Sequence, residues 1–99
     1  MFAYAEFGAI ASGTGTHAEG SSTASGECSH AECYSTASGW YSHAEGSSTA
    51  SGGYSHAEGS LAEAIGEASH AEGNSTKAIG AYSHAEGLLT YASGYCSHA

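Results

Sequence analysis

The feature that most constrains the fold of this chain is a short motif, S-H-A-E-G, that recurs along almost the whole sequence. Its histidines are separated by 13, 13, 13, 14, 14 and 14 residues. A second motif, A-x-G, lies between successive copies, and its glycine always precedes the next histidine by four residues. The additional residue of the longer units therefore falls in the connection that follows S-H-A-E-G. Such a pattern predicts stacked, nearly identical structural units.

Each unit is too short and too rich in glycine for a pair of helices, but it accommodates two short strands with glycines at the corners. The expected fold is all-β, a parallel β-solenoid with 13–14 residues and two short strands per turn. With turns about 4.8 Å apart, seven to eight turns would form a rod about 35 Å long. We expect one repeat domain over residues 1–99, with a degenerate unit at 1–13 and seven His-centred units over 14–99, the last one truncated. In the degenerate unit Tyr4 and Glu6 take the histidine and glutamate positions.

Alternation along a strand sorts the residues of the motif onto two faces. Ser, Ala and Gly share one face, and His and Glu share the other. Leu, Ile, Val and Phe together make up only 8 of the 99 residues, so the small residues are expected to fill the interior of a thin coil. The His/Glu face then points outward. Because one such coil buries little apolar surface, side-by-side association of several chains is also expected.

The charge of the chain excludes several classes of partner. Ten glutamates face a single cation, Lys77, which gives a net charge of −9 with neutral histidines. Such a chain cannot neutralise phosphates, so neither nucleic acid nor an anionic membrane is an expected partner. There is no Asp, which excludes a calcium-binding β-roll. No apolar run approaches the length of a membrane span, and the first residues lack the basic segment of a signal peptide.

The two motifs, S-H-A-E-G and A-[SI]-G at a period of up to 14 residues, resemble the head repeats of trimeric autotransporter adhesins of the YadA type. The pattern of that family is roughly S-V-A-I-G followed by A-x-G. The S-H-A-E-G copies are also similar to repeats of phage and prophage fibre-like proteins. The resemblance covers about residues 3–99 and implies a left-handed parallel β-roll, a side-by-side homotrimer and an extracellular adhesive or fibre role. His and Glu occupy the Val and Ile positions of the family, and no adhesin binding residue is carried over.

The main candidate site is a structural ladder of histidines and glutamates, because stacking places equivalent residues about 4.8 Å apart. Its members are His17, His30, His43, His56, His70, His84, His98, Glu19, Glu32, Glu45, Glu58, Glu72 and Glu86. The simplest interpretation is that each imidazole bonds a carboxylate of its own or a neighbouring chain and so fixes the register. Two alternatives are a metal-binding ladder and a pH switch, since imidazole and carboxylate bind zinc or copper and histidine titrates near neutrality.

Other recurring positions carry weaker signals. Adjacent strand residues such as Ser29 and His30 point to opposite faces, so they cannot form a nucleophile and base, and no enzyme activity or cofactor is expected. A column of threonines six residues after each histidine is expected at a solvent-exposed edge, with ice binding as a minor alternative. Its positions are Thr23, Thr36, Thr49, Thr76 and Thr90, interrupted by Ala62.

Tyrosines two residues before the histidine are interpreted first as packing residues, although Tyr and Trp at a surface also bind sugars or partners. These are Tyr41, Tyr54 and Tyr82, with Trp40 beside the first of them. Cys28 and Cys33 would lie about 16 Å apart along a strand, too far for a disulfide. Together with Cys96 they are expected to be free, buried thiols, and disulfides between neighbouring copies stay open.

The sequence therefore predicts a structural fibre or adhesin-head module that is extracellular, at a cell surface or on a virus particle. Its partner would be the chain itself, as a homotrimer and as rods stacking end to end into filaments. A segment of a longer fibre is the alternative to filaments. The alternative function is a ligand-binding module, either for an extracellular surface ligand or through the His/Glu ladder.

Overall fold

The computed structural model describes residues 3–5 and 8–99, so Glu6 of the degenerate unit lies outside the described residues. These residues form a parallel β-solenoid of about seven turns. The strands are β1 (Tyr4–Ala5), β2 (Ile10–Ala11), β3 (His17–Glu19), β4 (Thr23–Ala24), β5 (His30–Cys33), β6 (Thr36–Ala37), β7 (His43–Ala50), β8 (His56–Ala64), β9 (His70–Asn74), β10 (Lys77–Ala78), β11 (His84–Leu88) and β12 (Tyr91–Ala92). The predicted all-β parallel solenoid is confirmed, with two short strands in each turn except those formed by β7 and β8, which are single longer strands.

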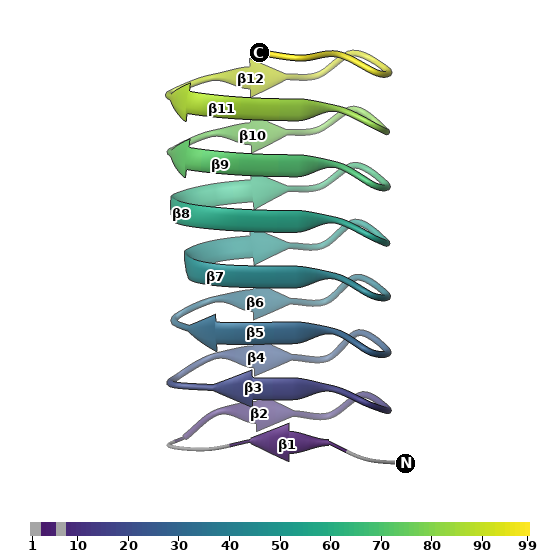
Figure 1. Cartoon of the computed structure of the whole chain (residues 1–99), viewed down its shortest axis with the longest axis vertical. Coiled ribbons are helices and arrows are strands. Elements are labelled where there is room, and N and C mark those ends of the chain that lie inside the picture. The colour runs from purple at the N-terminus through teal and green to yellow at the C-terminus, as the bar shows by residue number, and fades with distance from the viewer. Residues whose placement is uncertain (1–2, 6–7) are drawn as a thin grey trace.

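The turns stack so that each motif lies on the same motif of the next turn (Figure 1). One sheet contains the S-H-A-E-G strands, with His17 opposite His30 and His30 opposite His43. The other contains the strands that end at A-x-G, with Ala24 opposite Ala37. β7 and β8 pass through both sheets without a break. The principal-axis extents of 35 × 21 × 9 Å agree with the predicted length.

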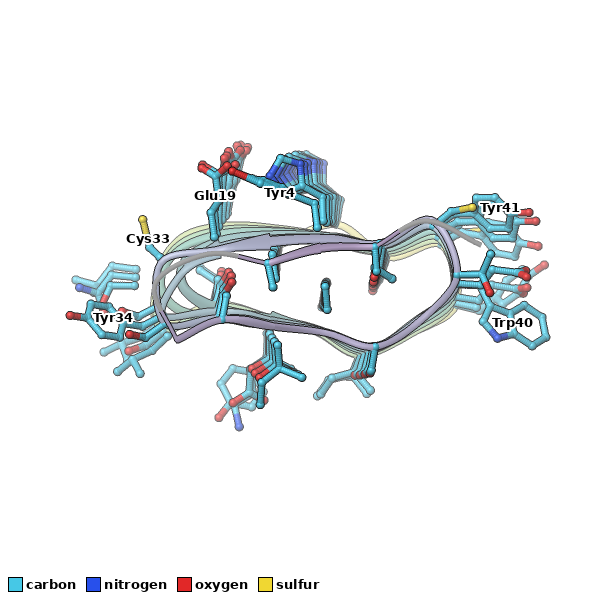
Figure 2. The ribbon with its side chains drawn as sticks, turned by 90° about the horizontal axis from the view of Figure 1, so that it is seen from below. Tyr4, Glu19, Cys33, Tyr34, Trp40 and Tyr41 are labelled. Atoms are coloured by element: carbon cyan, nitrogen blue, oxygen red, sulfur yellow. The ribbon has the colours of Figure 1, made fainter. Side chains whose placement is uncertain are left out.

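The interior is filled by small side chains from the two sheets, as the alternation predicted (Figure 2). Thirteen alanines form the buried apolar core, twelve of them without any exposed surface. Serines and threonines of neighbouring columns are also buried. The glycine of S-H-A-E-G departs from the prediction, because it lies at a corner of the coil in the left-handed region, as at Gly46 with φ 82°. Among the described residues, the interior side chains are therefore those of alanine, serine and threonine, and the glycines of A-x-G, such as Gly39, are buried beside them.

Three buried serines in the shorter units connect their turn to the next through a backbone carbonyl. The hydroxyl oxygen of Ser35 lies 2.7 Å from the carbonyl oxygen of Glu32 and 2.8 Å from that of Ala44 in the following turn. Ser48 repeats this arrangement one turn later, with Glu45 and Ala57. These two hydroxyls are tolerated in so thin an interior because each finds a carbonyl acceptor. The hydroxyls of Ser29, Ser69 and Ser83, in contrast, are buried without a hydrogen-bond partner among the described residues.

The longer units insert their additional residue where the sequence predicted. The pairing of β7 with β8 runs in register to Ser47 opposite Ser60, and then resumes with Thr49 opposite Glu63. One extra residue is therefore absorbed between the two sheets. The interior column is retained across this shift, since Ala62 is fully buried two residues before Ala64, as Ser48 is before Ala50.

The opposite corner, between A-x-G and the histidine, places a non-glycine residue in the left-handed region in nearly every turn. The φ angles are 55° at Tyr41, 60° at Tyr54 and 53° at Ala68. This conformation brings Cβ close to the following carbonyl oxygen and costs about 1–2 kcal/mol for an L-residue. The coil therefore carries a repeated local strain that glycine would relieve.

Replacing Ala68 with glycine is expected to raise the free energy of unfolding by about 0.5–1 kcal/mol, because glycine adopts the left-handed conformation without strain. The substitution removes only one methyl group, so little packing is lost. Ala81 is a matched control, since it lies in an equivalent turn one position before Tyr82 and has no positive φ. Ala81→Gly should lower stability by about 0.5–1 kcal/mol. Chemical denaturation measures the free energy of unfolding of both variants. A change in the same direction for both would contradict the presence of strain at Ala68.

Candidate functional site: the His/Glu ladder

The structure brings all thirteen predicted ladder residues together on the outer face of one sheet. Parallel pairing continues from His17 to His84, and an isolated bridge adds His98. The glutamates follow the same register two residues further along each strand, up to Glu72 opposite Glu86. Tyr4 occupies the histidine position of the first turn, where its ring centroid lies 4.8 Å from that of His17. The ladder is therefore continuous along the described solenoid.

The imidazole rings form one stacked column. Consecutive ring centroids lie 4.6–4.8 Å apart, and consecutive planes are inclined by 1–6°. This spacing is the separation of neighbouring strands, so the backbone ladder sets the spacing of the rings. The Nε2 atoms of the middle five histidines are inaccessible to solvent and lack a hydrogen-bond partner among the described residues. These are His30, His43, His56, His70 and His84.

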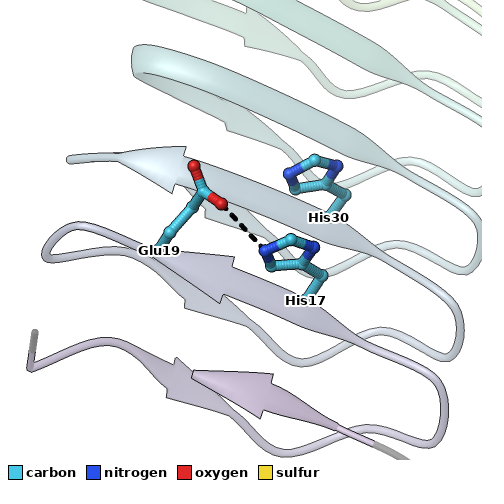
Figure 3. A group of neighbouring side chains, drawn as sticks. All are labelled: His17, Glu19 and His30. Atoms are coloured by element: carbon cyan, nitrogen blue, oxygen red, sulfur yellow. Dashed lines mark hydrogen bonds and ion pairs between the residues drawn. The ribbon is translucent and has the colours of Figure 1, made fainter. Parts of the chain in front are cut away.

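Each histidine lies beside the glutamate of its own turn or of the turn before it. The Nε2 atom of His17 is 2.9 Å from Oε2 of Glu19, in hydrogen-bonding geometry (Figure 3). Higher in the column the nitrogen lies between two carboxylates, as at His70, 3.6 Å from Glu58 and 3.3 Å from Glu72. The remaining Nε2–Oε distances are 3.2–3.9 Å. The predicted imidazole–carboxylate pairing is thus a hydrogen bond in the first turn and a close contact without hydrogen-bonding geometry above it.

The electrostatics of the column act against protonation in its middle. Desolvation by burial lowers the pKa of His30 below its usual 6.5, and the neighbouring imidazoles of His43 and His17 lower it further. The pKa of His56 is lowered for the same reasons, with His43 and His70 as its neighbours. Nearby glutamates oppose both shifts but do not reverse them. A stacked column cannot accept a proton on every ring without placing like charges one strand spacing apart.

Acidification from pH 8 to pH 5 is therefore expected to lower the melting temperature. Because the pKa of His30 and His56 is lower in the folded state, the unfolded chain binds more protons as the pH falls through about 6.5, and the free energy of unfolding decreases. The double variant His30→Gln, His56→Gln should show a smaller decrease. His98→Gln is the control, since its side chain is 63% exposed at the last rung. A melting temperature that rises on acidification would show that relief of the glutamate repulsion dominates instead.

The geometry of the stack disfavours an ion shared between rings. Two histidines and a glutamate, such as His17, Glu19 and His30, bring their ligand atoms within 4.8 Å of one another. Zinc holds its ligands at about 2.0–2.2 Å, so two ligands of one ion lie at most about 4.4 Å apart. This distance is shorter than the 4.6–4.8 Å between the centroids of neighbouring rings. The nitrogen lone pair lies in the ring plane, and the planes here are parallel. A shared ion would need the rings to rotate out of the stack, so the arrangement favours direct imidazole–carboxylate pairing.

A shallow groove of about 760 Å³ follows the glutamates along the solenoid axis. Its wall is acidic, and its floor is formed by the corner glycines that succeed each glutamate. The lining residues are Glu32, Glu45, Gly46, Glu58, Gly59, Glu72, Gly73, Glu86 and Gly87. The ladder therefore presents a continuous acidic surface rather than an enclosed pocket.

The threonine column is only partly as predicted. Thr23, Thr36 and Thr49 do stack on the outer face of the second sheet, but the next residue in register is Glu63, followed by Lys77. Counting six residues from the histidine is wrong in the longer units, because the additional residue precedes this position. As a result Thr76 is fully buried in the interior column that holds serine in the shorter units. A threonine surface of three rungs with charged neighbours does not provide the regular array that ice binding requires.

The cysteines lie differently from the prediction, whereas tyrosines pack on one another, at the surface of the coil. Cys28, Cys33 and Cys96 are free, as expected, but they are exposed rather than buried. The tyrosines before the histidine are exposed as well, with 51% of Tyr41 and 59% of Tyr54 accessible. Tyr41 and Tyr54 stack on one another at the outer corner, with ring centroids 5.2 Å apart, and Tyr82 contacts Tyr95. The strand alternation gave no signal for this, because the positive φ at the corner turns the side chain outward.

Comparison with known proteins adds no family assignment, since no family model and no curated protein matches this chain. Among the described residues there is no helix long and apolar enough to cross a bilayer.

Proposed function

We propose that this chain is a structural module of an extracellular or virion-associated fibre or adhesin head. In this proposal, three copies of a left-handed β-roll lie side by side, and the rod spaces or displays binding surfaces. The repeating geometry supports such a role, because every turn presents the same outer columns at a fixed interval of about 4.8 Å. The His/Glu ladder then acts as a structural element that keeps the turns in register and places an imidazole beside each ladder glutamate.

The observation that carries the proposal is the distribution of the large side chains. Every Leu, Ile, Tyr and Trp of the chain is exposed, with accessible fractions between 38% for Ile79 and 76% for Tyr95. The buried residues of the described chain are alanine, serine, threonine and glycine. These exposed side chains are available for contacts with other molecules, since exposed apolar patches mark interaction sites. Association would also supply the apolar burial that so thin a coil lacks.

A concentration series of thermal melts tests the association. If folding is coupled to assembly, the melting temperature should rise with protomer concentration, because mass action stabilises the assembled state. A melting temperature that does not change over a hundredfold range of concentration would indicate that the single coil is stable alone. If the exposed tyrosine rings contact a neighbouring chain, the melting temperature should depend less on concentration in a triple variant, Tyr82→Ser, Tyr91→Ser, Tyr95→Ser.

Electron microscopy tests the proposed end-to-end stacking. Stacked rods would continue the parallel ladder from one molecule to the next and appear as filaments of varied length. Discrete rods of one length would contradict end-to-end stacking but would be compatible with side-by-side association.

A further inference from the structure

The corner that precedes each histidine strand contains a second stacked column, one position before the left-handed residue. Backbone hydrogen bonds join its rungs, with the amide of Tyr54 donating to the carbonyl of Trp40 and the amide of Ala68 donating to that of Gly53, both at 2.7 Å. The column consists of Thr14, Glu27, Trp40, Gly53, Glu67, Ala81 and Tyr95. Gly53 is its only residue without a side chain, and it lies directly between Trp40 and Glu67.

The missing side chain leaves a notch in the solenoid surface. A Cβ placed on Gly53 would meet no atom within 4 Å, so the space above it is open. The notch has a volume of about 310 Å³, and Trp40, Tyr54 and Glu67 line it together with the hydroxyl-bearing Ser38 and Ser51. Trp40 and Glu67 are two turns apart, or about 9–10 Å at the strand spacing. An aromatic residue and a carboxylate thus form opposite walls. Figure 2 shows Trp40 projecting outward from this corner.

Neither wall has a partner within the described chain. The Glu67 carboxylate forms no ion pair or hydrogen bond with another described residue, in contrast to the ladder glutamates. The single cationic side chain, Lys77, lies on the other sheet, where its Nζ atom is 3.5 Å from Glu63. Trp40 is 66% exposed. An unpaired carboxylate facing an exposed indole is a combination suited to a positively charged group.

We propose that this notch binds a small organic cation, of the quaternary or methylated ammonium class. Tryptophan is the most favourable aromatic partner for a cation, and quaternary ammonium groups are recognised by aromatic side chains in this way. Tyr54 supplies a second aromatic wall, and Glu67 supplies the countercharge. The net charge of −9 attracts such a ligand at long range. The inference does not depend on the proposed fibre role, because the notch lies within one coil.

A neutral sugar is the competing ligand, since exposed aromatic rings beside hydroxyl groups also bind carbohydrate. The charge favours the cation, because a sugar leaves the Glu67 carboxylate without compensation. The test therefore compares choline with 3,3-dimethylbutan-1-ol, which has the same shape but no charge, and with glucose.

Trp40 is the only tryptophan of the chain, so its fluorescence reports on the notch directly. Titration with choline at constant ionic strength is expected to change the emission with a dissociation constant on the order of 1 mM. Glu67→Gln should weaken binding about threefold or more. Glu27→Gln is the matched control, because it removes the same charge from the rung on the other side of Trp40, where the column has no glycine. It should leave the affinity within about twofold.

Gly53→Leu provides a second variant that fills the notch without altering charge, at a position with open space for a side chain. It should abolish the response while the circular dichroism spectrum stays unchanged. The proposal would be overturned if choline and its neutral analogue bound equally, if glucose bound better, or if no probe changed the emission. It would also be overturned if Glu27→Gln and Glu67→Gln weakened binding equally.

Discussion

Gly39→Ala is expected to prevent folding, whereas Gly53→Ala, fourteen positions further along, is expected to be tolerated. A Cβ on Gly39 would overlap the carbonyl of Gly52 in the next turn, which is backbone and cannot move aside without separating the turns. Nothing lies within 4 Å of the corresponding position on Gly53. Neither glycine has a positive φ, so the comparison isolates steric overlap from backbone conformation.

The loss for Gly39→Ala should be at least about 3 kcal/mol, a large part of the stability of a domain of this size. Thermal denaturation followed by circular dichroism would show either no transition or a midpoint lowered by about 12 °C or more. Gly53→Ala should change the midpoint by only a few degrees, upward if it reduces the entropy of the unfolded chain. Similar midpoints for the two variants would show that the turns are not stacked as closely as described.

Ala57→Leu is expected to have the second largest effect. Ala57 is fully buried in the middle of the alanine column, between Ala44 and Ala71 in the neighbouring turns. The interior has no larger side chain than threonine, so leucine would force the two sheets apart. Overpacking of a close-packed interior typically costs about 1–3 kcal/mol, and a coil with no other core to adjust should reach the upper end of this range or exceed it.

Thr49→Leu is the matched control for Ala57→Leu. Thr49 points outward from the second sheet, in a column that also accepts Ile10, Lys77 and Tyr91. This variant adds a large apolar group at the surface and should change the free energy of unfolding by no more than about 0.5 kcal/mol. Equal losses for the two variants, measured by chemical denaturation, would contradict the assignment of the alanines to the interior.

Much of the fold could be predicted from the sequence because the two recurring motifs, S-H-A-E-G and A-x-G, contain the residues that pack closely inside the coil and between its turns. The residue four positions before each histidine is always glycine because a Cβ there would overlap the next turn, as at Gly39. The alanine of S-H-A-E-G is small because it faces the opposite sheet across a thin interior. The outward direction of His30 and Glu32 follows from the same alternation. The ladder was therefore predictable residue by residue.

The corners could not be predicted in the same way. Strand alternation ends where the backbone enters the left-handed region, so it does not reveal that Tyr54 and Cys28 point outward. The threonine column was wrong at Thr76 because a count from the histidine ignores where the additional residue lies. The notch at Gly53 depends on which rungs of a corner column are neighbours, and this becomes visible only when the register of the turns is known.

The mass of the protein in solution tests the proposed assembly most directly. Size-exclusion chromatography with multi-angle light scattering should give three times the 9.8 kDa mass of the chain, as expected for three rods that bury their exposed apolar columns against one another. A single species of 9.8 kDa with an unchanged β-sheet spectrum would show that the coil folds and persists alone, and it would contradict the account of a self-associating structural module.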